Sequence, residues 1–183
     1  MVMLRSLQEF IDETRTLYDC GRYRSFPPQR AAAVVEVAPE PSARAKAAIE
    51  ILGRQFAAEV ESIVRLRRHA ETARYSQFRE QLASIASQEQ RHAQALVRRI
   101  HELGGKVAKV AVDGVTNTSG WQALADDRER EIRCCDELVE ALALSKDLDA
   151  ETAELLESIL SDERLHLQAI SDMHLRTDPQ AAP

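Results

Sequence analysis

An internal repeat restricts the fold of this chain more than any other feature of its sequence. Residues 82–96 read LASIASQEQRHAQAL and residues 156–170 read LESILSDERLHLQAI, so that eight of fifteen positions are identical at a constant offset of 74. In both copies apolar residues recur at the spacing of three and four that is typical of an amphipathic helix. A Glu-x-x-His motif interrupts the apolar stripe of each copy. The repeat therefore predicts two helices that present similar faces, so that one part of the fold imitates another.

Four long stretches of helical periodicity surround and include the two copies. Helices are predicted over residues 42–72, 76–103, 119–145 and 150–174. Ser42 is a candidate N-cap, and the Gly104-Gly105 pair ends the second helix. The turns within each pair of helices are short, whereas residues 106–118 form a Val-rich crossover without a helical pattern. Two antiparallel helix hairpins joined by a long crossover are one form of the four-helix bundle, so the sequence predicts an all-α fold of this kind.

The rest of the chain divides by composition. Residues 1–23 are predicted to contain a short amphipathic N-terminal helix, because apolar residues recur there at helical spacing before Gly21. Residues 24–42 contain four prolines and read as an extended connector. The predicted bundle then occupies residues 43–176, and residues 177–183 form a tail.

Composition and charge exclude several classes of function. The chain has 183 residues, of which 44% are apolar and 30% charged, and its formal net charge is −6. This negative balance argues against nucleic acid as a partner, and no apolar stretch is long enough to span a membrane. The three cysteines, Cys20, Cys134 and Cys135, form no Cys-x-x-Cys pair. Reduced thiols and a cytoplasmic location are therefore expected.

Acidic residues also interrupt the apolar stripes of the first and third predicted helices. Glu59 and Glu131 lie in phase with the leucines and isoleucines of their own helices. Their neighbours Glu61 and Glu129 fall on faces with arginine and other charged residues, so they are the weaker candidates for burial. We therefore choose Glu59 and Glu131 as the buried acids.

The four acids in the stripes are expected at one level of the bundle. In an antiparallel hairpin, two residues face each other when they are equally far from the turn. Glu59 and Glu89 have this relation in the first hairpin, and Glu131 and Glu163 have it in the second. The spacing therefore predicts one layer of four glutamates inside the bundle.

Such a layer requires positive charge. Four ionised carboxylates in a dry core would repel each other and lose their hydration, at a cost of many kcal/mol. Two divalent cations would balance them, with imidazole nitrogens as neutral ligands. The predicted metal ligands, which are also the predicted catalytic residues, are Glu59, Glu89, His92, Glu131, Glu163 and His166. Around them, Asp162 is expected to accept the free N–H of His92, and Gln88 that of His166.

Residues 45–175 resemble the ferritin-like superfamily, and within it bacterioferritin and rubrerythrin. The resemblance is carried by FAAEVESI, SQEQRHAQALVRRIHELGG, DRERE and ILSDERLH, which match the segments that hold the metal ligands of this family. It implies a ferritin-like four-helix bundle and a di-iron site built from the six residues above, with Glu89 and Glu163 as bridges. Gln90 stands where bacterioferritin has its haem-binding Met, so no haem is expected. Cys134 stands where rubrerythrin has a second glutamate.

The function implied by this resemblance is that of an oxidoreductase. Two iron ions are the expected metals, with manganese as the alternative. Fe(II) would be oxidised by O₂ or H₂O₂, as in a ferroxidase or a peroxide-detoxifying protein of iron homeostasis. A homo-oligomer, dimer or larger, is expected. Two other functions stay open: a di-metal oxidase that acts on an organic substrate, and a helical interaction module that binds no metal.

Several other residues receive a structural interpretation. His69, His101 and His174 lie near helix ends, where a charged imidazole interacts favourably with the helix dipole. No metal ligation is expected from them. Cys134 and Cys135 are expected to pack near the site as small apolar residues. Trp121 is interpreted as an anchor for the start of its helix.

Overall fold

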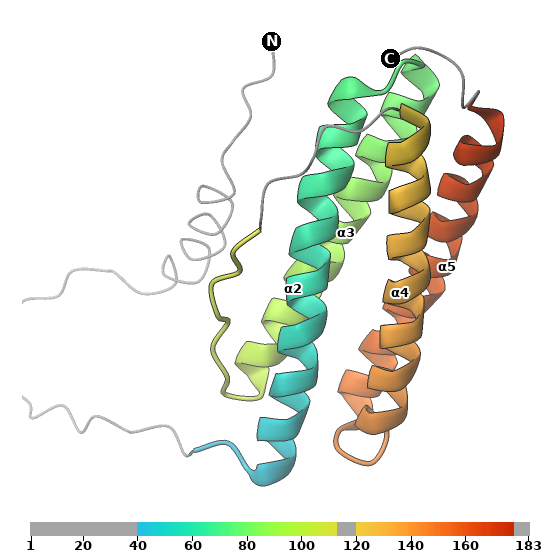
Figure 1. The fold of residues 1–183 in the computed structure, drawn as a ribbon. Coiled ribbons are helices and arrows are strands. Elements are labelled where there is room, and N and C mark those ends of the chain that lie inside the picture. The colour runs from blue at the N-terminus through green and yellow to red at the C-terminus, as the bar shows by residue number, and fades with distance from the viewer. Residues whose placement is uncertain (1–39, 113–119, 178–183) are drawn as a thin grey trace, which may run out of the picture. The chain divides into compact units, whose positions relative to one another are not determined.

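The computed structural model describes residues 40–112 and 120–177, and in these ranges it contains four long helices (Figure 1). They are α2 (Ala43–Thr72), α3 (Ser76–Glu102), α4 (Gly120–Ser145) and α5 (Ala150–Arg176). The predicted all-α bundle is confirmed, and the predicted helix ends agree to within two residues. The predicted N-terminal helix, nearly all of the connector and most of the tail lie outside the described residues. None of the described helices combines the length and hydropathy that a bilayer-spanning helix needs.

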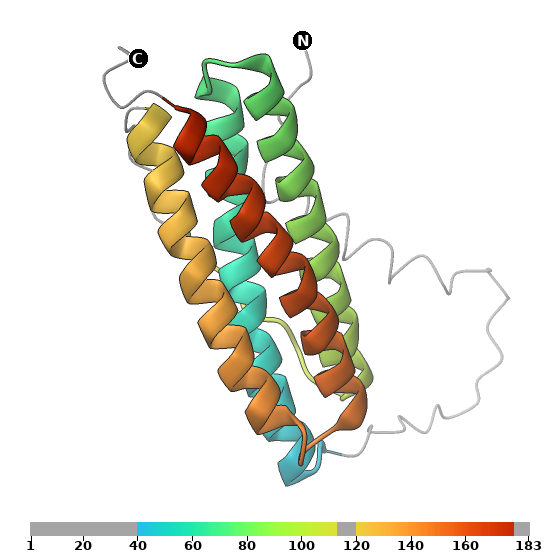
Figure 2. The same ribbon diagram turned by 90° about the vertical axis from the view of Figure 1, so that its right-hand side faces the viewer.

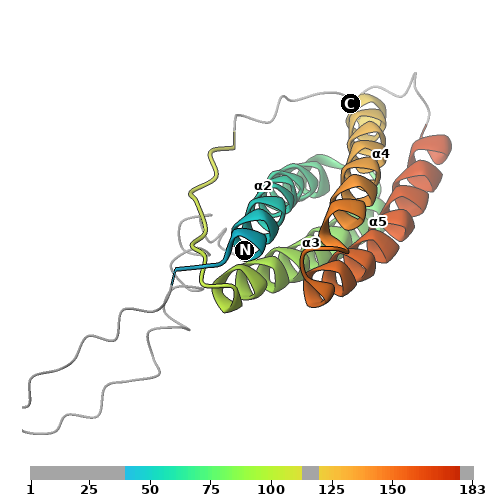
Figure 3. The ribbon, with the colours of Figure 1, turned by 90° about the horizontal axis from the view of Figure 1, so that it is seen from below.

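The helices form two antiparallel hairpins that pack side by side. Helix α2 packs mainly against α3, and α4 packs mainly against α5, which gives the two hairpins. Across the hairpins α2 contacts α4 and α3 contacts α5 (Figures 1 and 2). The described start of the crossover, residues 105–112, leaves the end of α3 and runs back beside α2 (Figure 3). The crossover therefore lets the second hairpin begin at the opposite end of the bundle from the end of α3.

Local sequence signals set the ends of these helices. Ser42 accepts a hydrogen bond from the backbone N–H of Ala45 at 3.2 Å, which confirms it as the N-cap of α2. Helix α3 ends because Gly104 adopts a φ of +79°, a conformation that glycine reaches without strain. The N–H of Gly105 then donates to the carbonyl of Ile100 at 2.8 Å and closes the helix end.

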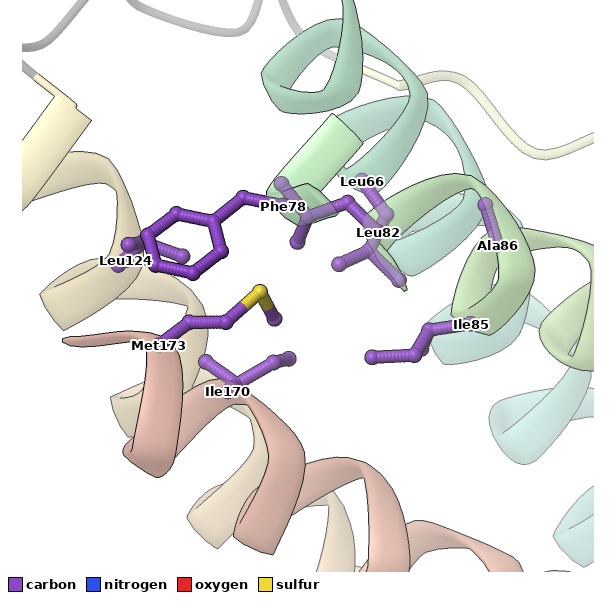
Figure 4. Close-up of a cluster of buried hydrophobic side chains, with 8 residues drawn as sticks. All are labelled: Leu66, Phe78, Leu82, Ile85, Ala86, Leu124, Ile170 and Met173. Atoms are coloured by element: carbon purple, nitrogen blue, oxygen red, sulfur yellow. The ribbon is translucent and has the colours of Figure 1, made fainter. Parts of the chain in front are cut away.

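The bundle core consists of apolar layers on either side of the acidic one. Each of the four glutamates in the apolar stripes has an apolar residue seven positions away along its helix, and these four apolar residues belong to a buried cluster near one end of the bundle (Figure 4). These residues are Leu66, Leu82, Leu124 and Ile170. Seven positions from each glutamate in the opposite direction is a leucine that is almost completely buried. These leucines are Leu52, Leu96, Leu138 and Leu156. Each contributes about 2 kcal/mol by burial, and together the two layers hold the four acids at a fixed depth.

Arg99 joins the two hairpins at the end of the bundle where α3 ends and α5 begins. Its guanidinium donates two hydrogen bonds to Asp149, at 2.7 and 2.9 Å, and also contacts Glu102 and Glu151. Asp149 in turn caps α5 by accepting from the N–H of Thr152 at 2.9 Å. Although burial opposes it, the bonds from Thr152 and Arg99 lower the pKa of Asp149. This contact fixes the start of α5 against the end of α3.

Candidate metal centre

Four glutamates, one from each helix, form a layer inside the bundle. The relative exposure is 6% for Glu59, 1% for Glu89, 1% for Glu131 and 2% for Glu163. They are buried because each lies in phase with the apolar residues of its helix, between the two apolar layers described above. The weaker candidates lie nearer the surface: Glu61 pairs with Arg130 at 2.9 Å, and Glu129 pairs with Arg133 at 2.8 Å.

Two histidines point their Nδ1 atoms at this layer. Nδ1 of His92 lies 3.3 Å from Glu89 Oε2 and 3.3 Å from Glu163 Oε1. Nδ1 of His166 lies 3.4 Å from Glu89 Oε1 and 3.5 Å from Glu163 Oε2. The two rings are nearly parallel, with centroids 5.8 Å apart. Each ring therefore offers one nitrogen to the space between the carboxylates.

The six side chains, the metal-site cluster from here on, form two overlapping groups of potential ligands. Within each group the candidate ligand atoms all lie within 4.8 Å of one another. The first group is Glu59, Glu89, His92 and Glu163, and the second is Glu89, Glu131, Glu163 and His166. Two ligand atoms on opposite sides of one divalent ion are about 4.2 Å apart, because each bond is about 2.1 Å long. Each group therefore has the spacing for one ion, and Glu89 and Glu163 belong to both.

Unsatisfied polar atoms concentrate in the same place. Six buried side-chain N or O atoms among the described residues have no hydrogen-bond partner, and four of them belong to the metal-site cluster. They are Glu89 Oε1, Glu131 Oε2, Glu163 Oε1 and His166 Nδ1. Because a buried polar atom without a partner costs about 1–3 kcal/mol, four such atoms at one point indicate a missing ligand. Oxygen and imidazole donors in this number fit a pair of divalent iron or manganese ions.

The pKa values of the carboxyl groups also indicate that the cluster holds more acidic side chains than its own positive charges can balance. Burial raises the pKa of Glu59 well above its ordinary value, and repulsion from Glu89 and Glu163 adds to this against a lowering contact with His92. Burial also raises the pKa of Glu131 to about 11, and Glu163 contributes in the same direction. Burial would raise the pKa of Glu163 too, but contacts with His166 and His92 outweigh it and lower that pKa. Without an ion, Glu131 therefore keeps its proton at neutral pH, and the ionisation of Glu59 is disfavoured in the same direction.

The imidazoles carry positive charge for the same reason. Burial opposes the charged form of His92, but its contacts with Glu163 and Glu59 dominate and raise its pKa to about 12. Contacts with Glu163 and Glu89 overcome burial at His166 as well and raise its pKa to about 9. Protons thus supply positive charge that divalent ions would otherwise bring, and ion binding must displace those protons.

The outer nitrogen of each imidazole has a polar partner on the other copy of the repeat. Nε2 of His92 lies 3.1 Å from Asp162 Oδ2, and Nε2 of His166 lies 2.9 Å from Gln88 Oε1. With Nε2–H donating outward, Nδ1 presents its lone pair inward in the neutral ring. The structure thus brings all eight predicted site residues together, while their roles toward a metal remain predictions.

A second buried polar group was missed by the sequence interpretation. Asp127, on α4, accepts a hydrogen bond from Arg65 at 3.1 Å and lies 2.5 Å from Nδ1 of His69, both on α2. His69 is therefore buried against a carboxylate and does not simply face the helix end as expected. The available signal was the phase of Asp127, four residues before Glu131 on the same apolar stripe. We call these three residues the Asp127 cluster.

The remaining residues singled out in the sequence have packing roles. The ring of Trp121, at the start of α4, lies 4.8 Å from that of His174 on α5, as expected for an anchor. Cys134 is buried and Cys135 half-buried, and neither forms a disulfide. Burial raises the pKa of both thiols, and the charges of Glu131 and Glu163 raise them further. Both thiols are therefore poor nucleophiles beside the metal-site cluster.

Comparison with known proteins agrees with this architecture. The ferritin family, described as the ferritin-like domain, matches residues 49–177. The bacterioferritin of Desulfovibrio desulfuricans, whose diiron site is known in different catalytic states, is 27% identical; the similarity covers 72% of this chain and 80% of that one, with a TM-score of 0.67. No curated protein matches the chain.

Two further solved structures share the fold. A ferritin-like, diiron-carboxylate protein from Bacillus anthracis str. Ames is 23% identical, over 73% of this chain and 99% of that one, with a TM-score of 0.67. A dodecameric thioferritin, the bacterioferritin-related protein of Bacteroides fragilis, is 21% identical, over 70% of this chain and 84% of that one, with a TM-score of 0.64. Since the family match spans more than two thirds of the chain and the bundle has the expected connectivity, this chain belongs to the ferritin-like domain family.

Proposed function

We propose that this chain is a ferritin-like di-iron protein that binds two Fe(II) ions in the metal-site cluster and oxidises them with O₂ or H₂O₂. The observation that carries the proposal is the pair of overlapping ligand groups, buried and lined with unsatisfied oxygen and nitrogen atoms. The diiron site of the similar Desulfovibrio desulfuricans bacterioferritin and the diiron-carboxylate description of the Bacillus anthracis protein support iron as the metal.

The residues suit iron as a substrate that changes its charge. Carboxylate oxygens are hard ligands that favour Fe(III) over Fe(II), whereas imidazole binds both states. Two Fe(II) ions release two electrons, and two electrons together with two protons from the solvent reduce one O₂ to H₂O₂ or one H₂O₂ to two waters. Glu89 and Glu163 belong to both ligand groups, so they would hold the two irons next to each other during this transfer. The role in the cell would be iron storage or the removal of Fe(II) and peroxide.

The proposal is tested by neutralising the shared ligands. Glu89→Gln and Glu163→Gln keep the side-chain shape but remove a charge from both ligand groups. We expect the initial rate of Fe(II) oxidation to fall at least about 100-fold in each variant, because neither iron keeps its full ligand set. The rate is followed by the absorbance of Fe(III) after anaerobic loading and addition of O₂ or H₂O₂.

Glu129→Gln is the matched control, since Glu129 is an exposed acid on the helix that carries Glu131. It should oxidise iron at the wild-type rate. Wild-type rates in both shared-ligand variants would refute the proposal. Comparison of the two oxidants in the wild-type protein then separates a ferroxidase from a peroxide-detoxifying protein.

We also propose that the chain forms a homo-oligomer and acts in the cytoplasm. Large apolar side chains are exposed on the second hairpin, at Val139, Leu144, Leu165 and Leu175. The dodecameric assembly of the Bacteroides fragilis thioferritin is consistent with oligomers in this fold. Light scattering after size exclusion tests the assembly, and a monomeric mass at micromolar concentration would contradict it. A cytoplasmic location fits the free thiols of Cys134 and Cys135.

A further inference from the structure

The two ligand groups are related by the internal repeat, but their surroundings are not identical. The repeat pairs Glu89 with Glu163 and His92 with His166 at the constant offset of 74. The residue before each repeated glutamate differs: it is Gln88 in the first copy and Asp162 in the second. These two residues are the ones that contact the outer nitrogens of the histidines. The approximate symmetry of the site is therefore broken at the residues that orient its nitrogen ligands.

The two acceptors differ in charge. Asp162 offers a carboxylate to Nε2 of His92 at 3.1 Å, whereas Gln88 offers a neutral amide oxygen to Nε2 of His166 at 2.9 Å. A hydrogen bond to a carboxylate is stronger than one to an amide, and it pulls the imidazole proton outward. The inward Nδ1 of His92 therefore becomes a better electron donor than that of His166.

The charges around the two ligand groups also favour binding of an ion at the first group. Each ligand group contains three glutamates and one histidine. Within residues 40–112 and 120–177, only the first group has an additional carboxylate within hydrogen-bond distance of its histidine. The side chain of Asp162 is 47% exposed, so this charge avoids the desolvation that affects the four buried glutamates. The further acid on the side of the second group, Asp127, is already paired with Arg65 and His69, whereas Asp162 adds its negative charge to the first group through His92.

We propose that the position formed by Glu59, Glu89, His92 and Glu163 takes up the first divalent ion and holds it more tightly than the position that contains Glu131 and His166. The difference between Asp162 and Gln88 sets this order. Asp162 is a positioning residue that acts on the ion through His92. The inference rests on the proposed function, because it requires that divalent ions bind in the metal-site cluster.

Two exchanges that preserve side-chain shape test this order. Asp162→Asn makes both acceptors neutral, and the double variant Asp162→Asn with Gln88→Glu moves the charge from one histidine to the other. The probe is Co(II), which needs no oxidant and gives anomalous X-ray scattering. Crystals of each protein are prepared with one equivalent of Co(II), and the occupancies of the two positions are compared.

In the wild-type protein we expect at least about tenfold more Co(II) at the Glu59–His92 position than at the Glu131–His166 position. Asp162→Asn should bring the ratio close to one, and the double variant should invert it. A calorimetric titration should show two unequal binding steps in the wild-type protein and two similar steps in Asp162→Asn. Asp172→Asn, an exposed change on the same helix, is the matched control and should keep the wild-type ratio.

The outcomes separate this inference from the proposed function. If Co(II) fills both positions equally in the wild-type protein, or if neither exchange alters the order, the inference is wrong although the metal site stands. If Co(II) binds at neither position, the proposed function fails together with the inference. The wild-type occupancies decide the first point even if one of the variants does not fold.

Discussion

The bundle contains two buried polar clusters that solve the problem of buried charge in opposite ways. In the Asp127 cluster one carboxylate meets the guanidinium of Arg65 and the imidazole of His69, and both of its oxygens have partners. In the metal-site cluster four carboxyls meet two imidazoles, and four polar atoms find no hydrogen-bond partner in the described part of the chain. The first cluster is complete within the protein, whereas the second is complete only when positive charge is added.

This difference distinguishes a structural ion pair from a ligand site. Burial of acids alone does not indicate function, since Asp127 is as buried as Glu131. The useful distinction is whether the donors and charges already balance. Both carboxylate oxygens of Asp127 are already engaged by other side chains, whereas several oxygen and nitrogen atoms of the metal-site cluster are available to bind a divalent ion. Each cluster can therefore be altered while the other serves as the reference.

The largest effect should come from adding metal. A ligand present at 1,000 times its dissociation constant stabilises the native state by about 4 kcal/mol, so two ions together contribute about 8 kcal/mol. We expect an excess of Co(II) to raise the unfolding temperature by more than about 10 °C over the protein in EDTA. Thermal scans followed by circular dichroism measure this shift. A shift of less than about 2 °C would show that the metal-site cluster does not depend on an ion.

Removal of the acid from the balanced cluster should have the next largest effect. Asp127→Ala leaves Arg65 and the buried His69 without their carboxylate, which should cost about 3 kcal/mol of unfolding free energy. Denaturant unfolding in EDTA measures this loss. The same variant should still gain stability from Co(II) as the wild-type protein does. Loss of the Co(II) response would mean that the two clusters are not independent.

The stability of the metal-free protein should fall as pH rises from about 6.5 to 9. The pKa values of His166 and His92 are raised to about 9 and about 12, so the folded state holds protons that the unfolded state releases above pH 6.5. The raised pKa of Glu131, about 11, acts in the same direction across this range. The lowered pKa of Glu163 makes stability depend on pH only below the ordinary pKa of a glutamate, outside this interval.

A proton retained by the folded state contributes about 1.4 kcal/mol per pH unit. Because the three groups share one cluster and their titrations are coupled, we expect the folded state to retain one net proton, which gives a loss of about 3 kcal/mol over this interval. Denaturant unfolding in EDTA at several pH values measures it. Co(II) should remove the dependence, because the ions replace these protons. A metal-free protein that becomes more stable towards pH 9 would contradict the assigned charges.

The smallest effect should come from Glu131→Gln in the metal-free protein. Because the raised pKa keeps Glu131 protonated at pH 7, a neutral amide of the same shape replaces it with a change of less than about 1 kcal/mol. The matched change Asp127→Asn should cost more, since one oxygen of this carboxylate accepts from Arg65 and the other contacts His69, and an amide replaces one of these oxygens with a donor. Urea unfolding at pH 7 compares the two variants. Equal losses would remove the distinction between the clusters.

The helices and the acidic layer could be predicted from the sequence because both depend on periodicity. The stripe phase of Glu59 and Glu131 separated them from Glu61 and Glu129, and the structure buries the first pair only. The equal distances of the acids from the turns indicated one level, which follows from the regular rise of a helix. Each of these signals lies within one helix or one hairpin.

The Asp127 cluster could not be predicted in the same way. Its members come from α2 and α4, which belong to different hairpins, so their contact depends on how the hairpins rotate against each other. Periodicity within one helix carries no information on that rotation. The sequence showed His69 only as a residue near a helix end, and the acid that pairs with it lies 58 residues further along the chain.

The division of the ligands between the hairpins has a mechanical consequence. Glu59, Glu89 and His92 come from the first hairpin, and Glu131, Glu163 and His166 come from the second. A pair of ions would therefore cross-link two halves that otherwise meet through side-chain packing, hydrogen bonds and ion pairs, in the way that a disulfide joins distant parts of a chain. Loading would suppress the separation of the hairpins as a whole, so amide hydrogen exchange would slow along all four helices together.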